Sequence, residues 1–131
     1  MSSEAIQIQR RSDGSAAEAT LLDGMVPQDF ILVGTEWFAE RSLVMQKLLK
    51  SAVPRPKWPQ SIHWDWRQKA PELKLLEVTG FGVTCDRQWQ GVMLTKTASY
   101  TARLDPDKGK PLVYIDFLET APWNWMIPEI G

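Results

Sequence analysis

The sequence predicts an α+β fold, in which two N-terminal helices precede an antiparallel meander of three or more strands. Apolar residues recur at helical spacing over residues 35–76, whereas those of residues 77–120 alternate with a period of two, which is typical of strands. The length of 131 residues suits one domain, so we expect residues 1–131 to form a single domain.

The first third of the chain is the least clearly patterned part. Residues 1–20 are polar and rich in Ser, Ala and Glu, and we expect a loop or an arm there. Within them, residues 6–9 alternate apolar and polar side chains, which fits either a short strand or an ordered arm. Residues 29–33, between Pro27 and Gly34, are either a short buried strand or the start of the next helix, because periodicity cannot separate these at such a length.

Two helices are expected between residues 35 and 76. Thr35 is a suitable N-cap for the first helix, and Glu36 complements the helix dipole in its first turn. A proline-rich connector follows over residues 51–60, since prolines are not tolerated in a helix interior. The second helix covers about residues 64–76, and Pro71 kinks it or restarts it at a first helical position.

Three strands are expected after the helices, joined by polar turns. They cover residues 77–84, 89–104 and 112–120. The third is almost continuously apolar, which predicts a central position in the sheet. Lys96 falls among the apolar positions of the second strand, so we expect a bend or bulge near it. Residues 121–131 are expected to form a tail.

Composition excludes several classes of function. The formal net charge of −1 argues against a protein that coats nucleic acid, and no apolar run is long enough to span a bilayer. We therefore expect no nucleic-acid or membrane partner and a cytoplasmic location. One histidine, His63, and one cysteine, Cys85, do not make a metal site or a catalytic triad, and no P-loop is present.

Seven tryptophans are many for this length. We expect Trp37, Trp66 and Trp89 to enlarge a small core, because each tryptophan buries a large area. Trp123 and Trp125 follow the last strand and are candidates for an exposed interface.

The last predicted strand carries the candidate chemistry. Asp116 shares a face with Tyr114, and Glu119 points to the other face. A carboxylate in an apolar strand is costly unless it is paired, and it can serve as a general base. The alternative is that the carboxylate is paired with a neighbouring cation such as Arg103 or Lys96.

Three segments resemble the GNAT superfamily of acyl-CoA N-acyltransferases. Residues 111–124, with the sequence PLVYIDFLETAPWN, resemble the fourth strand of certain bacterial members, and this match is moderately specific. Residues 90–94 resemble the preceding hairpin, and residues 64–66 resemble the helix before it. The resemblance covers about residues 62–124.

The resemblance implies acetyl-CoA as co-substrate and assigns roles along the last strand. In the superfamily, the end of the fourth strand splays from the fifth, and its exposed backbone binds the pantetheine arm. The corresponding backbone here is that of Leu118, Glu119 and Thr120. Asp116 would be the carboxylate that deprotonates an amine, and Tyr114 could assist.

The sequence also departs from the family pattern. The family continues into a glycine-rich loop at a helix N-terminus, which binds pyrophosphate through free backbone N–H groups. Residues 125–131 contain no such loop, so we expect the chain alone to be inactive. The last strand would then need cover from a homodimer partner, a complementary chain or the N-terminal segment. The rival hypothesis is a non-catalytic module that binds a protein or small ligand.

Overall fold

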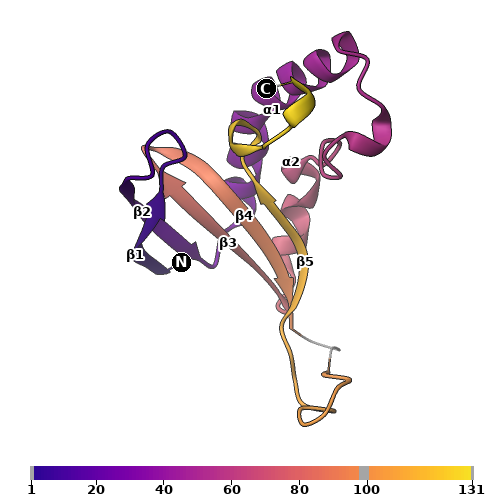
Figure 1. The fold of residues 1–131 in the computed structure, drawn as a ribbon. Helices are drawn as coiled ribbons and strands as arrows, with labels where there is room; N and C mark the ends of the chain where they lie inside the picture. The colour runs from indigo at the N-terminus through magenta and orange to yellow at the C-terminus, as the bar shows by residue number, and fades with distance from the viewer. Residues whose placement is uncertain (1, 98–100, 131) are drawn as a thin grey trace.

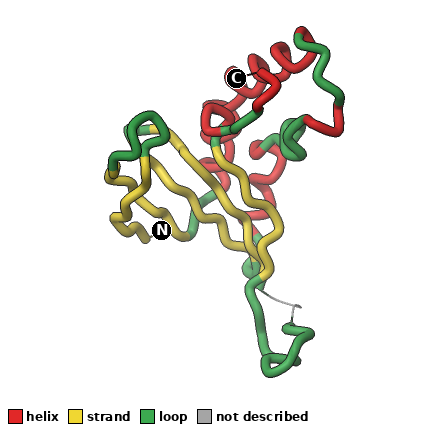
Figure 2. The backbone as a smooth tube through the Cα atoms, viewed as in Figure 1, coloured by secondary structure: helices red, strands yellow, loops and turns green. Residues whose placement is uncertain are grey.

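The computed structural model describes residues 2–97 and 101–130, and its central feature is one antiparallel sheet with α1 and α2 on one side (Figures 1 and 2). The five strands lie in the order β1-β2-β3-β4-β5, and all neighbours pair antiparallel. The elements in chain order are β1 (Ser2–Gln9), β2 (Ala16–Asp23), α1 (Pro27–Lys50), α2 (Trp66–Lys69), β3 (Val78–Cys85), β4 (Gln88–Lys96) and β5 (Tyr114–Thr120). Short 3₁₀ helices cover Arg55–Lys57, Ala70–Lys74, Pro122–Asn124 and Pro128–Ile130.

The prediction of two N-terminal helices is wrong, because a β-hairpin comes before α1. β1 and β2 pair along their whole length, from Ser2 opposite Asp23 to Gln9 opposite Ala16. The segment expected to be a loop or arm is therefore the first two strands of the sheet. Its apolar signal is weak because β1 is an edge strand with mostly exposed residues, and β2 buries only the small side chains of Ala17 and Ala19.

The first helix begins earlier than Thr35. Pro27 occupies one of the first positions of α1, where its missing N–H costs nothing, and the Asp29 carboxylate accepts a 2.8 Å hydrogen bond from the Val26 N–H. Of the two alternatives for residues 29–33, the structure has the start of the helix. Gly34 does not end the helix; a Cβ there would lie 2.9 Å from the backbone nitrogen of Arg67, so Gly34 lets α2 approach closely.

The second helical segment is shorter and less regular than predicted. α2 has four residues, and the chain then tightens into the 3₁₀ helix Ala70–Lys74, with Pro71 in its first turn. Pro71 thus restarts the segment, which was one of the two expected outcomes. The Asp65 side chain caps α2 by accepting from the Arg67 N–H at 3.0 Å.

The main core lies between α1, α2 and strands β3–β5. Trp37 and Trp66 are fully buried in it, as expected, and Trp89 packs against it half-buried. Phe30 meets Trp66 edge-on, with ring centroids 5.0 Å apart. Gly82 has no room for a side chain, since a Cβ would lie 2.6 Å from the Trp89 ring.

The last strand is at the edge of the sheet, which corrects its expected central position. β5 pairs with β4 on one side and has no strand on its other side among the described residues. Its apolar side chains are largely exposed, with Ile115 at 53% and Leu118 at 61%. The continuous apolar run of residues 112–120 therefore belongs to an edge strand with exposed side chains, not to a strand that is buried on both faces.

β4 is also shorter than the predicted strand over residues 89–104. It ends at Lys96, and residues 101–113, which precede β5, project beyond the sheet (Figure 1). Residues 98–100 of the predicted strand lie outside the described residues. In the part of the chain that the structure describes, no helix has the length and apolar character needed to cross a bilayer.

Candidate functional site

A bulge in β5 sets the position of Asp116. Phe117 lies opposite Leu94, but Ile115 lies opposite Thr95, so Asp116 is an extra residue in β5. The irregularity predicted near Lys96 is present as a register shift between β4 and β5, but the extra residue lies in β5, because β4 keeps its register with β3 through Lys96. A bulge breaks the simple alternation of side chains, so the parity of Asp116 in the sequence does not define its surroundings.

Asp116 is paired with a cation. Its Oδ2 atom lies 3.0 Å from Lys96 Nζ, and the same ammonium is 3.6 Å from a carboxylate oxygen of Glu72. This is one of the two ion pairs named as alternatives to a catalytic role. Tyr114 is the register partner of Lys96 and is 45% exposed, so the two candidate catalytic residues flank the same lysine.

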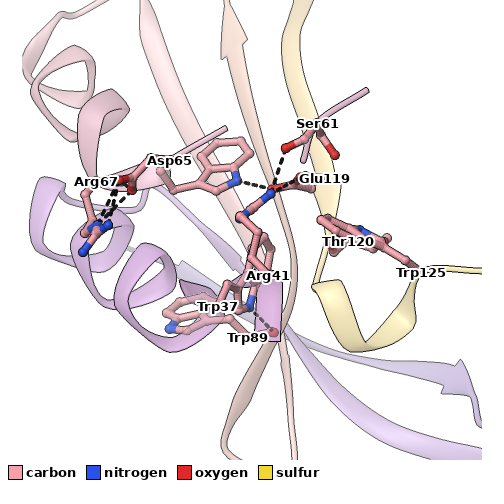
Figure 3. Close-up of polar contacts among 10 residues, drawn as sticks. Trp37, Arg41, Ser61, Asp65, Arg67, Trp89, Glu119, Thr120 and Trp125 are labelled. Atoms are coloured by element: carbon pink, nitrogen blue, oxygen red, sulfur yellow. Dashed lines mark hydrogen bonds and ion pairs between the residues drawn. The ribbon is translucent and has the colours of Figure 1, made fainter. Parts of the chain in front are cut away.

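Glu119 is the most deeply buried carboxylate of the site, with 1% of its side chain exposed. Arg41 of α1 binds both of its oxygens, at 2.7 and 3.1 Å, and also donates to the Ser61 carbonyl at 2.8 Å (Figure 3). Trp66 Nε1 donates to Glu119 Oε1 at 2.8 Å. A paired and hydrogen-bonded carboxylate of this kind connects β5 to the helices.

The backbone of residues 118–120 faces two directions. The Ala121 N–H donates to the Gln90 carbonyl at 2.9 Å, and hydrogen-bonded pairs alternate along an antiparallel ladder. Glu119 therefore directs its N–H and C=O toward β4, whereas Leu118 and Thr120 direct theirs away from the sheet. Of the three backbone positions expected to bind pantetheine, two are available at the outer edge.

Trp125 covers the end of this edge. Its Nε1 donates to the Thr120 carbonyl at 3.1 Å, and the Arg41 guanidinium lies 5.3 Å from the centre of its ring (Figure 3). Trp125 is half-buried rather than free on the surface. The outward groups that remain are the N–H and C=O of Leu118 and the N–H of Thr120.

Gln90 anchors the turn that carries Trp125. It is the extra residue of a second bulge, because Gly91 lies opposite Val83 and Trp89 lies opposite Thr84. Its Oε1 accepts from Trp123 Nε1 at 3.0 Å and from Asn124 Nδ2 at 2.9 Å. The sequence analysis missed both Gln90 and Arg41, since their partners are more than 30 residues away.

A second group of charges lies near α2. The Asp65–Arg67 ion pair, at 2.8 Å, holds the pKa of the Asp65 carboxyl below its usual range through hydrogen bonds from Arg67. Lys69 Nζ lies 3.4 Å from the centre of the Phe117 ring, and burial lowers the pKa of this lysine. A cleft of about 330 Å³ lies between α1 and residues 62–68, and the exposed His63 lines it.

Cys85, which the sequence analysis did not assign to a metal site or a catalytic triad, has no catalytic neighbour in the structure described here. Cys85 is a buried free thiol whose Sγ lies 3.4 Å from the Glu18 carbonyl. Within residues 2–97 and 101–130, no three His, Cys, Asp or Glu side chains are grouped so that they could hold a metal ion.

We expect Asp116→Asn to lower the free energy of unfolding by no more than about 1 kcal/mol, because its ion pair with Lys96 is partly solvated. Urea unfolding of the variant and the parent measures this difference. Asp107→Asn is the matched control, since Asp107 pairs with Lys110 on the exposed loop and should show no measurable change. A loss above about 3 kcal/mol would mean that Asp116 is a structural carboxylate, as large as a broken buried pair.

Comparison with known proteins gives no relative on which to base a function. No family model, no curated protein and no solved structure matches this chain. The functional argument therefore rests on the residues and geometry of the site.

Proposed function

We propose that this chain is the substrate-side half of an acyl-CoA-dependent N-acyltransferase, completed by a second polypeptide that covers β5. The observation that carries the proposal is the outward backbone of Leu118 and the outward N–H of Thr120 on a free edge strand. An extended pantetheine arm carries amide groups that can pair with such an edge as a β-strand does. The resemblance of residues 111–124 to the GNAT fourth strand supports this reading.

Asp116 is the proposed proton acceptor. Its Oδ2 is occupied by Lys96, which leaves Oδ1 to take a proton from the acceptor amine, directly or through water. The amine nitrogen then bonds to the thioester carbonyl carbon, the C–S bond breaks, and the thiolate leaves with a proton. Tyr114, two residues away on β5, is the proposed donor of that proton.

Glu119 has a positioning role in this proposal. Its carboxylate is enclosed by Arg41 and Trp66, and its backbone pairs with β4. It therefore fixes the end of β5 rather than touching a ligand. The proposal assigns the pyrophosphate-binding loop to the complementary polypeptide.

Titration of the purified chain with acetyl-CoA in a calorimeter tests the proposal, with molecular size measured in the same buffer. We expect saturable binding that Thr120→Pro weakens about fivefold to tenfold, because proline removes an outward N–H without breaking the ladder to β4. Thr120→Val keeps that N–H and should bind like the parent. The proposal fails if the folded chain shows no saturable binding, or if the proline and valine variants bind equally.

A protein-interaction module is the second candidate. It is favoured by the combination of a free β5 edge with exposed Ile115 and Leu118, because edge strands accept a strand from a partner. The genomic neighbourhood of the gene distinguishes the two functions without any experiment on the protein. A neighbouring open reading frame that encodes a glycine-rich loop, a helix and two strands supports the split enzyme, and its absence supports the interaction module.

A further inference from the structure

The sheet face opposite α1 holds an apolar trough that no element of the described chain covers. It has a volume of about 330 Å³ and runs across all five strands, from Ile8 of β1 to Leu118 of β5. Between these ends it is lined by Leu21 of β2, Phe81 and Val83 of β3, and Met93 of β4. Contiguous exposed apolar surface of this kind is uncommon on monomers and marks a binding surface.

One end of the trough is basic. A second hollow of about 360 Å³ shares Ile8, Gln90 and Thr120 with the trough, and Arg10 and Arg11 line it. The two hollows therefore join side by side, one apolar and one polar. Small-molecule sites have this composition, with mostly apolar walls and a few polar groups that fix orientation.

The two arginines retain hydrogen-bonding capacity. Arg11 donates once, to the Asn124 carbonyl at 2.8 Å, and has no carboxylate partner in the part of the chain described here. Arg10 contacts Asp86 at 3.5 Å, and both of these side chains are well exposed. Each guanidinium has five N–H donors, so an anion between them would find unused donors. Asp86 is the one acidic side chain that lines the polar hollow.

We propose that this face binds an amphipathic anion, specifically a fatty-acid carboxylate, with its chain in the apolar trough and its head group at Arg10 and Arg11. The trough is apolar along its length and the two arginines lie in the hollow that adjoins it, which is the arrangement that an anion with an apolar chain requires. The trough lies on a sheet face and is lined in part by Leu118 and Thr120, whose outward backbone groups belong to the proposed acyl-CoA site, so the two sites adjoin at β5 and are tested with different ligands.

The test is calorimetric titration of the full chain with sodium decanoate, below the concentration at which decanoate forms micelles. Two probes separate the chain from the charge: decanol has the same length without charge, and butyrate has the charge with a short chain. We expect saturable 1:1 binding of decanoate, at least tenfold weaker binding of decanol and no measurable binding of butyrate.

Variants assign the two ends of the site. Arg11→Gln should weaken decanoate about tenfold and leave decanol unchanged, whereas Met93→Gln should weaken both. Arg87→Gln is the matched control, since Arg87 is an exposed arginine that lines neither hollow. Arg11 lies in an exposed loop, so its variant remains informative if Met93→Gln fails to fold.

Three results would overturn the inference. They are the absence of saturable decanoate binding, equal binding by Arg11→Gln and the parent, and equal weakening by Arg87→Gln. Molecular size in the same buffer identifies the reason for a failure, because a dimer that ignores decanoate would mean that a second copy covers this face. Loss of decanoate binding with acetyl-CoA binding intact would leave the acyltransferase proposal standing.

Discussion

Replacement of Arg41 by methionine is expected to lower the free energy of unfolding by about 3–5 kcal/mol, because it leaves the Glu119 carboxylate buried without its counter-ion. Arg41 donates to both oxygens of that carboxylate and also to the Ser61 carbonyl. A loss of this size corresponds to a fall in Tm on the order of 10 °C for a domain of this length. Urea unfolding followed by far-UV circular dichroism measures it.

The second variant that completes this experiment is Glu119→Gln. Glutamine keeps an acceptor for Trp66 Nε1 but carries no charge, so the double variant Arg41→Met/Glu119→Gln should be more stable than Arg41→Met alone. Lys96→Met is the control for removal of a cation on β4, because its carboxylate partners are partly solvated and the loss should stay near 1 kcal/mol. Simple additivity of the Arg41 and Glu119 effects would show that the pair is not coupled.

Replacement of Trp37 by alanine is expected to cost about 3–5 kcal/mol through the cavity it leaves. Trp37 is fully buried on α1, its ring meets Trp123 edge-on at 6.4 Å, and its Nε1 donates to the Trp89 carbonyl at 3.0 Å. Loss of the indole also leaves that carbonyl without its donor. Thermal and urea unfolding both report the change.

Phe38 is the matched control for this prediction. It is the next residue of the same helix and is 56% exposed, with the Arg67 guanidinium 5.2 Å from its ring centre. Phe38→Ala removes an aromatic side chain from α1 without opening a core cavity, so its effect should stay within about 1 kcal/mol. Similar losses for Trp37→Ala and Phe38→Ala would contradict the assignment of Trp37 to the core.

The sequence determined the elements whose signal is local. The change to a period of two placed β3 within one residue of its observed start, and the polar turn after it marked the hairpin to β4. The burial of Trp37 and Trp66 followed from their spacing on helical faces. One charged residue at an apolar position indicated an irregularity near Lys96, which the structure has in the neighbouring strand β5. Each of these depends on neighbours within a few residues along the chain.

Only the tertiary structure decided the features that join distant segments. Pro27 and Gly34 look like boundaries in the sequence, but Pro27 starts α1 and Gly34 is retained inside it because α2 crosses there. β1 was undetermined because its apolar side chains pack against the small residues of β2, which carry little periodic signal.

The candidate site divides in the same way. The sequence pointed to β5 and to its two carboxylates, but it could not assign their environments. A bulge in β5 places Asp116 beside Lys96. The carboxylate of Glu119 is bound by Arg41, which lies 78 residues away in the sequence. The sequence of an apolar strand is the same whether the strand is central or at an edge of the sheet. Local periodicity shows which side chains are apolar, but it does not show how many strands will pair with that strand. That number is set by the order of strands in the sheet, which only the folded chain defines.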